Sequence, residues 1–141
     1  MSIEWPEGLA ELEEFLMSKG LYSQCRGPVP HSGGEIRWQY GNDKIAIRVS
    51  ADRGIAWSAQ VSDVEGWSDQ WWVACELKDL IGGASGASSF CRRHCVSDGM
   101  KTIQENWDAI VEAFAPENRS RTHTQLKNIR AEYWAKRGLG L

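Results

Sequence analysis

Two cysteines and a histidine gather within the short segment CRRHC at residues 91–95. On a helix, Cys91, His94 and Cys95 would share one face, because residues three and four apart are neighbours there. Thiolate and imidazole groups are the usual protein ligands of zinc, and a fourth ligand could come from Cys25 or His31. Structural zinc sites, however, usually combine two paired ligand motifs, and the sequence holds only one. We therefore expect no bound metal and no cofactor.

A thiol beside a histidine can also act as a nucleophile, provided that the histidine serves as a base and a third group orients it. Cys91 or Cys95 could pair in this way with His94 or His123. No catalytic signature surrounds these residues, and the chain contains no phosphate-binding loop, dinucleotide fingerprint, nucleophile elbow or zinc-protease motif. We therefore expect a protein that is not an enzyme and has no catalytic residues.

A second segment, residues 63–72 (DVEGWSDQWW), concentrates acids and tryptophans where a loop is expected to lead into a helix. Aromatic side chains surrounded by charge are typical of the residues that dominate binding energy at protein interfaces. Trp72 is the expected exposed tryptophan, because Trp71 falls on the core stripe of the predicted helix; alternatively, Trp67 and Trp71 only cover the sheet. The predicted partner-binding residues are Asp63, Glu65, Trp67, Asp69 and Trp72, followed by Glu11 and Glu14.

The composition is that of a single globular domain spanning residues 1–141, with 42% hydrophobic residues and a net charge of −3. Acidic residues outnumber basic ones in residues 1–90, and the reverse holds in residues 91–141. An acidic first half argues against nucleic acid as the partner and favours a basic protein. The sequence does not determine the oligomeric state.

The N-terminal sequence has no signal-peptide pattern, and no apolar run has the length of a membrane span. We therefore expect a cytoplasmic protein that has no membrane partner and keeps its thiols reduced.

These candidate residues are expected to sit on a segregated α+β fold, in which an N-terminal helix and a four-stranded antiparallel meander precede about three helices on one face of the sheet. The apolar residues recur with helical period in residues 5–19, 68–80, 99–114 and 122–136. They alternate instead in the strands that contain Trp38, Val49 and Trp57, and residues 21–26 are a further candidate strand. Thr122 and Gln125 are a candidate capping box for the last helix.

The layout resembles the small immunity proteins encoded beside bacterial polymorphic toxins, including those of contact-dependent growth inhibition. The resemblance lies in the N-terminal helix, the meander with Trp38, Tyr40 and the Asp52-Arg53-Gly54 turn, a helix that ends in Leu-Ile-Gly-Gly, and the Asn106-Trp107-Asp108 segment. It implies an antitoxin that binds and neutralises a cognate toxin domain, in many cases a basic nuclease. Two alternatives remain: a small zinc- or thiol-dependent enzyme or regulator that uses Cys91, His94 and Cys95, and a secretion-system adaptor or chaperone.

Overall fold

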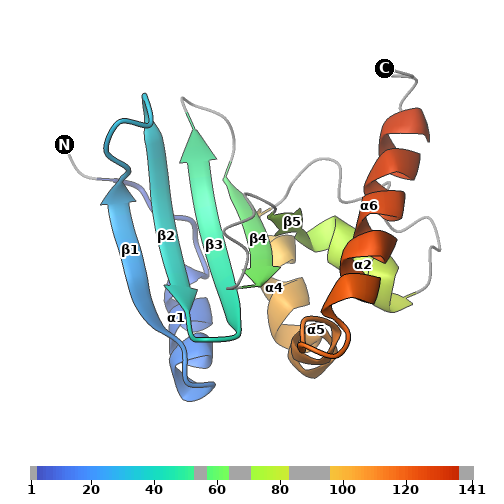
Figure 1. Cartoon of the computed structure of the whole chain (residues 1–141). Helices are drawn as coiled ribbons and strands as arrows, with labels where there is room; N and C mark the ends of the chain where they lie inside the picture. Colours follow the sequence, from blue (N-terminus) through green and yellow to red (C-terminus); the bar gives the residue numbers. More distant parts are fainter. Residues whose placement is uncertain (1–2, 53–56, 64–70, 83–95, 137–141) are drawn as a thin grey trace.

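A computed structural model describes residues 3–52, 57–63, 71–82 and 96–136. The fold is α+β: an N-terminal helix is followed by an antiparallel sheet and then by several helices, as the sequence predicts (Figure 1). The elements are α1 (Leu9–Ser18), β1 (Tyr22–Pro28), β2 (Glu35–Gly41), β3 (Ile45–Asp52), β4 (Ser58–Asp63), β5 (Trp72–Val73), α2 (Ala74–Gly82), α4 (Val96–Glu105), α5 (Trp107–Ala113) and α6 (Arg119–Lys136).

The sheet is a meander in which each strand is antiparallel to the strand before it, in the order β1-β2-β3-β4-β5. Trp38 lies opposite Val49, and Val49 lies opposite Ala59, so all three side chains point to the same face. That face is the buried one, since Trp38 and Val49 are fully enclosed in the core. The predicted alternation of apolar residues in these strands is confirmed.

The described helices cover one face of this sheet and its β5 end. Figure 1 shows α1 and α4 behind the sheet, with α2, α5 and α6 beyond β4 and β5. Leu12 and Leu16 of α1, Ile103 of α4 and Leu126 of α6 join the same hydrophobic core as the strands. The amphipathic helices therefore bury the apolar side of the sheet, which stabilises the fold mainly by removing this surface from water.

Helix α4 lies unusually close to the sheet because it presents a glycine there. A Cβ atom on Gly99 would lie 3.1 Å from Cβ of Ala59 on β4 and 3.4 Å from Cβ of Ala74 on α2. Three small residues thus meet where α2, α4 and β4 converge. The approach explains why a glycine stands in the first turns of a helix, where it is otherwise unfavourable.

Two predicted helices differ from the observed ones. The predicted helix over 68–80 begins only at Ala74, because Trp72 and Val73 form a fifth strand paired with Val61 and Gln60. The predicted helix over 99–114 is two helices, α4 and α5, separated at Asn106. The Asn106 side-chain amide donates to the carbonyl of Thr102 at 2.9 Å and so competes with the helical hydrogen bonds.

The first and last helices also begin at residues other than those predicted. Helix α1 starts at Leu9 instead of residue 5, and Gly8 precedes it with a φ of 94°, a conformation that suits glycine. Helix α6 starts at Arg119, so Thr122 lies inside the helix instead of capping it. The Thr122 hydroxyl donates to the carbonyl of Ala113 at 2.5 Å and thereby ties α6 to the end of α5.

None of the helices in the described part of the chain combines the length and the apolar character that a membrane crossing requires.

Candidate functional site

The most distinctive polar arrangement in the described structure surrounds a buried carboxylate at the end of β4. Asp63 is the last residue of β4, and its side chain is only 1% exposed. Its Oδ2 atom lies 3.2 Å from Nε of Arg119 and 2.8 Å from Nε2 of His123, both on α6. These contacts are close but lack hydrogen-bond alignment, so the attraction is mainly Coulombic. The carboxylate therefore holds two basic side chains of α6 against the sheet.

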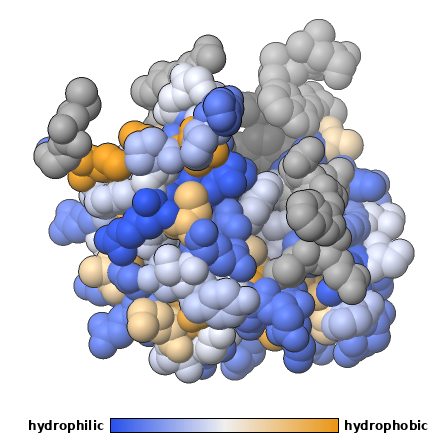
Figure 2. All heavy atoms as spheres, turned by 60° about the vertical axis from the view of Figure 1, so that its left-hand side comes forward, coloured by the Kyte–Doolittle hydropathy of each residue, from blue (hydrophilic) through white to orange (hydrophobic). Residues whose placement is uncertain are grey.

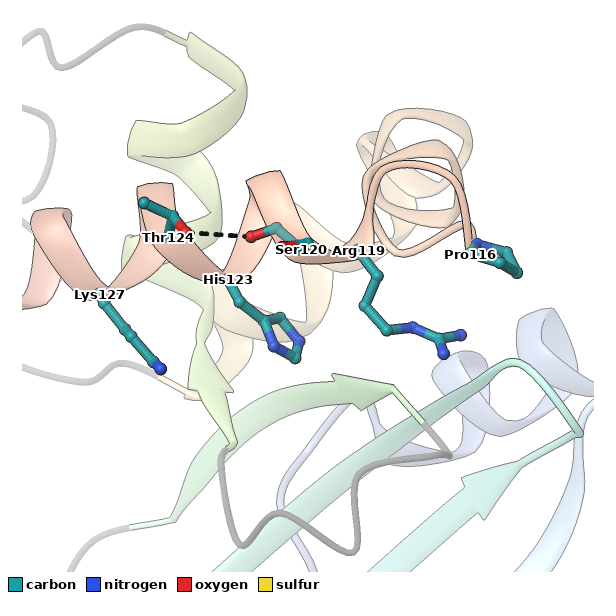
Figure 3. A pocket seen from close by; sticks show the side chains of 6 residues that line it. All are labelled: Pro116, Arg119, Ser120, His123, Thr124 and Lys127. Carbon is teal, nitrogen blue, oxygen red and sulfur yellow. Dashed lines mark hydrogen bonds between the residues drawn. The ribbon is translucent and has the colours of Figure 1, made fainter.

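The same two basic residues line an open concavity on α6. It has a volume of about 460 Å³ and is lined by Pro116, Arg119, Ser120, His123, Thr124 and Lys127. Figure 3 shows Arg119, His123 and Lys127 projecting from one side of α6 toward the sheet, with His123 between the other two. The three residues are four positions apart in the helix and therefore share one face. The arrangement presents up to three positively charged groups to whatever enters the concavity.

A second set of contacts along α6 anchors the helix further from this concavity. Arg130 places Nε 2.6 Å from Oε2 of Glu76 and Nη2 2.8 Å from Oε1, a bidentate ion pair. Nη2 also donates to the carbonyl of Trp71 at 2.9 Å, and the guanidinium lies 4.3 Å from the ring centroid of Trp72. Because Glu76 is buried, this pair fixes the position of α6 over α2 and β5.

The prediction that Trp72 is the exposed tryptophan of this region is wrong. Trp72 is only 1% exposed, because its position in β5 points its ring into the core. Trp71, which was expected to face the core, is partly exposed, and Arg48 of β3 lies 4.3 Å from the centroid of its ring. The two residues exchange roles because neighbouring residues of a strand point to opposite faces.

Arg48 belongs to the sheet face that the described helices leave free. Its Nε donates to the side-chain carbonyl of Gln60 at 2.7 Å. Burial, followed by the charge of the neighbouring Arg37, lowers the pKa of the Arg48 guanidinium to about 10, so the group stays charged near neutral pH. With Gln60 and Trp71, Arg48 forms a polar and aromatic row across β3, β4 and the residue that precedes β5.

The predicted acidic residues of α1 lie at the surface. Glu11 and Glu14 are exposed and form no ion pair with any described residue. Glu13, between them, instead turns toward the sheet, where it accepts a hydrogen bond from the Tyr40 hydroxyl and lies 3.4 Å from Nη1 of Arg26. Burial and the hydrogen bond to Glu13 both raise the pKa of Tyr40. Glu11 and Glu14 are thus available to a partner, whereas Glu13 holds α1 to the sheet.

Asp63 was predicted to begin an exposed acidic loop, and the structure places it inside the fold. Strand β4 continues through Asp63, whose carboxylate faces Arg119 and His123 instead of solvent. Three other predicted partner-binding residues, Glu65, Trp67 and Asp69, lie outside the described residues. The structure thus brings neither of the described predicted binding residues of that segment, Asp63 and Trp72, to an exposed surface.

The candidate metal ligands Cys91, His94 and Cys95 also lie outside the described residues. Of the two suggested fourth ligands, Cys25 is half-buried on β1 with its thiol 3.9 Å from the carbonyl of Arg37, and His31 is exposed in the loop after β1. Within the described ranges, no three histidine, cysteine or acidic side chains gather closely enough to hold a metal ion.

The roles of Arg119 and Lys127 were not predicted from the sequence, and His123 was proposed only as a partner of a thiol. Part of their signal is present, because His123 and Lys127 are four positions apart in the predicted helix over 122–136, but Arg119 precedes that helix. Nothing in the local sequence, however, connects this face to Asp63 on β4.

Comparisons with protein-family models, with curated proteins and with solved structures find no match to this chain.

Proposed function

We propose that this chain is an immunity protein, a cytoplasmic antitoxin that binds a cognate toxin domain and neutralises it by stoichiometric binding. The layout of the chain resembles that of the small immunity proteins of bacterial polymorphic toxins, and this resemblance implies a binding role instead of a catalytic one. The observation that carries it is the exposed acidic surface of α1. Carboxylates without ion-pair partners at a surface attract a basic protein and accelerate its association.

The composition of this surface supports the proposal. Glu11 and Glu14 lie on the exposed side of α1, opposite the buried Leu12 and Leu16. The two most exposed large apolar side chains of the described structure follow directly: Met17 at the end of α1, 59% exposed, and Tyr22 at the start of β1, 60% exposed. Exposed apolar side chains together with charged ones are the usual composition of a protein interface.

Figure 2 views the molecule from the side on which β1 lies, and hydrophilic surface predominates there, with apolar residues in separate places. Such a surface does not form a broad apolar patch of the kind that obligate oligomers bury. It suits a partner that is captured electrostatically and then held by a few apolar contacts.

The test is co-expression of the chain with the C-terminal domain of the protein encoded immediately upstream. We expect co-expression to restore growth and a 1:1 complex to co-purify. A toxic domain that is neither neutralised nor bound by the chain would overturn the proposal.

The interface is tested by reversing two charges. We expect the Glu11→Lys/Glu14→Lys variant to slow association with the toxin by at least about tenfold at low salt, with less effect at high salt. The matched control is Glu105→Lys/Glu132→Lys, which makes the same charge change at exposed acids of α4 and α6. Equal slowing in both variants would indicate a net-charge effect and would remove α1 as the interface.

A further inference from the structure

The concavity on α6 has the composition of an anion site. Its wall carries Arg119, His123 and Lys127 from one helix face, with Ser120 and Thr124 beside them. The Thr124 hydroxyl donates to the carbonyl of Ser120 at 3.1 Å, as Figure 3 shows. Lys127 is exposed and has no ion-pair partner among the described residues, so its ammonium group is available to a ligand.

Asp63 positions two of these side chains, although it does not itself line the concavity. The carboxylate is not among the residues that line the concavity, and its side chain is 99% enclosed by the fold. Through Oδ2 it approaches both Arg119 and His123, so their side chains are held in place before any ligand arrives. Side chains fixed in this way lose little conformational freedom on binding, which favours affinity.

The histidine is held in a way that determines which anion fits. The contact of Asp63 Oδ2 with Nε2 at 2.8 Å lacks hydrogen-bond alignment, but the negative oxygen still favours, by charge, the tautomer with its proton on that nitrogen. The other nitrogen, Nδ1, has no hydrogen-bond partner in the described part of the chain and, in the neutral ring, is an acceptor. The concavity therefore offers positive charge together with one acceptor.

We propose that this concavity binds a phosphate group, with Lys127 contacting the charged oxygens and Nδ1 of His123 accepting the hydrogen bond of the P–OH group. Inorganic phosphate near neutral pH carries both negative oxygens and an O–H donor. Sulfate and carboxylate ions carry only acceptor oxygens there, and a carboxylate fits best on the side-on edge of an arginine, part of which Asp63 already occupies at Nε of Arg119. The proposal is independent of the toxin partner.

The test follows the histidine ring resonances by NMR while inorganic phosphate is added, with chloride keeping the ionic strength constant. We expect a saturable shift at His123 with a dissociation constant on the order of 1 mM, the range of a single exposed anion site. His31, exposed in the loop after β1, serves as an internal control and should not respond. A shift that does not saturate, or an equal response at His31, would overturn the proposal.

Two further comparisons, one of lysine variants and one of anions, test whether Lys127 and Nδ1 of His123 contact the phosphate. Lys127→Gln should weaken phosphate binding by at least about fivefold, whereas Lys101→Gln, which removes the same charge from an exposed position on α4, should leave it unchanged. Sulfate should bind at least about fivefold more weakly than phosphate, because it cannot donate to Nδ1. Equal losses in the two lysine variants, or equal binding of the two anions, would contradict the assigned contacts.

Glycerol phosphate, a phosphomonoester, distinguishes free inorganic phosphate from the terminal phosphate of a small molecule as the ligand. Binding of glycerol phosphate as tight as that of inorganic phosphate would assign the site to phosphomonoesters and would contradict the assigned contact of Nδ1 with a P–OH group. Much weaker binding would assign it to free phosphate, since a phosphomonoester loses its last proton near pH 6 and then has no donor for Nδ1.

Discussion

Arg130 of α6 and Glu76 of α2 form a bidentate ion pair between helices whose contacting residues are 54 positions apart in the sequence. Glu76 Oε1 also accepts a hydrogen bond from the backbone N–H of Val73 at 3.0 Å, so one carboxylate connects β5, α2 and α6. The Glu76 side chain is 7% exposed and would remain charged and buried without the guanidinium. The pair therefore matters more through the cost of breaking it than through its own attraction.

Replacing Arg130 by methionine should lower the free energy of unfolding by about 3 kcal/mol, because Glu76 then lacks its partner. The partial exposure of Arg130 keeps the expected loss at the low end of the range for buried pairs. Urea unfolding measures the loss. Arg121→Met is the control on the same helix, and it should cost less than about 0.5 kcal/mol because Arg121 is exposed and, among the described residues, hydrogen-bonds only Asn118. Equal costs would show that the pair is unimportant.

The neighbouring tryptophans 71 and 72 should respond differently to the same substitution. Trp72→Phe should cost about 1–3 kcal/mol, since the ring is enclosed and the smaller side chain leaves a cavity. No hydrogen bond is lost, because the indole N–H of Trp72 has no partner among the described residues. Trp71→Phe should cost less than about 1 kcal/mol, because that ring is partly exposed and loses mainly its contact with Arg48. Chemical denaturation of both variants would check the order, and the reverse order would contradict the placement of β5.

The phenol of Tyr40 should make the protein less stable in alkali. Burial, followed by the hydrogen bond to Glu13, raises its pKa in the folded protein above the usual 10.0. The unfolded chain therefore loses this proton first as the pH rises. The stabilising contribution is complete below the unfolded pKa and disappears as the pH rises through the folded pKa.

Tyr40→Phe should consequently flatten the fall in stability above about pH 10, although it is less stable than the parent at neutral pH. Unfolding free energies measured across this pH range, together with tyrosinate absorbance, test the prediction. Tyr22→Phe is the control, since Tyr22 is 60% exposed, and it should leave the alkaline profile unchanged. Identical profiles for the parent and Tyr40→Phe would contradict the prediction.

A β-branched residue in place of Gly99 should destabilise the protein. Gly99→Val would press two methyl groups against Ala59 and Ala74 and should cost about 2 kcal/mol, despite the general weakness of glycine in helices. Lys101→Val, at an exposed position of the same helix, should cost only the propensity difference of about 0.5 kcal/mol. Thermal unfolding distinguishes them, and a Gly99→Val variant as stable as the Lys101→Val variant would contradict the close approach of α4.

Hydrophobic alternation in the sequence was sufficient to predict the central strands. Ile45, Ile47 and Val49 stand at every second position, with the smaller or polar Ala46, Arg48 and Ser50 after each of them, and the structure buries all three on one face. Such alternation is a local property of the chain and can be recognised without knowing what a strand pairs with. The same holds for the apolar stripes of α1 and α4.

The short fifth strand and the setting of Asp63 depend on distant residues, and the sequence pattern therefore missed both. Trp72 and Val73 form a strand because they pair with β4, and two residues carry no period of their own. Asp63 looked like a loop acid because its basic neighbours, Arg119 and His123, come from the last helix. The pattern at residues 123 and 127 indicated a basic helix face, but it indicated neither that the helix begins at Arg119 nor what the face contacts.

The meander also determines the order in which the protein can assemble during synthesis. Every strand pairs with the one that leaves the ribosome just before it, so the sheet requires no segment that is still to be made. Closing only short loops carries a small entropic cost, and such topologies fold quickly. Helix α6, which supplies Arg119, His123 and Arg130, is made after all of these strands. The nascent chain therefore carries Asp63 and Glu76 without these cations until α6 has been synthesised.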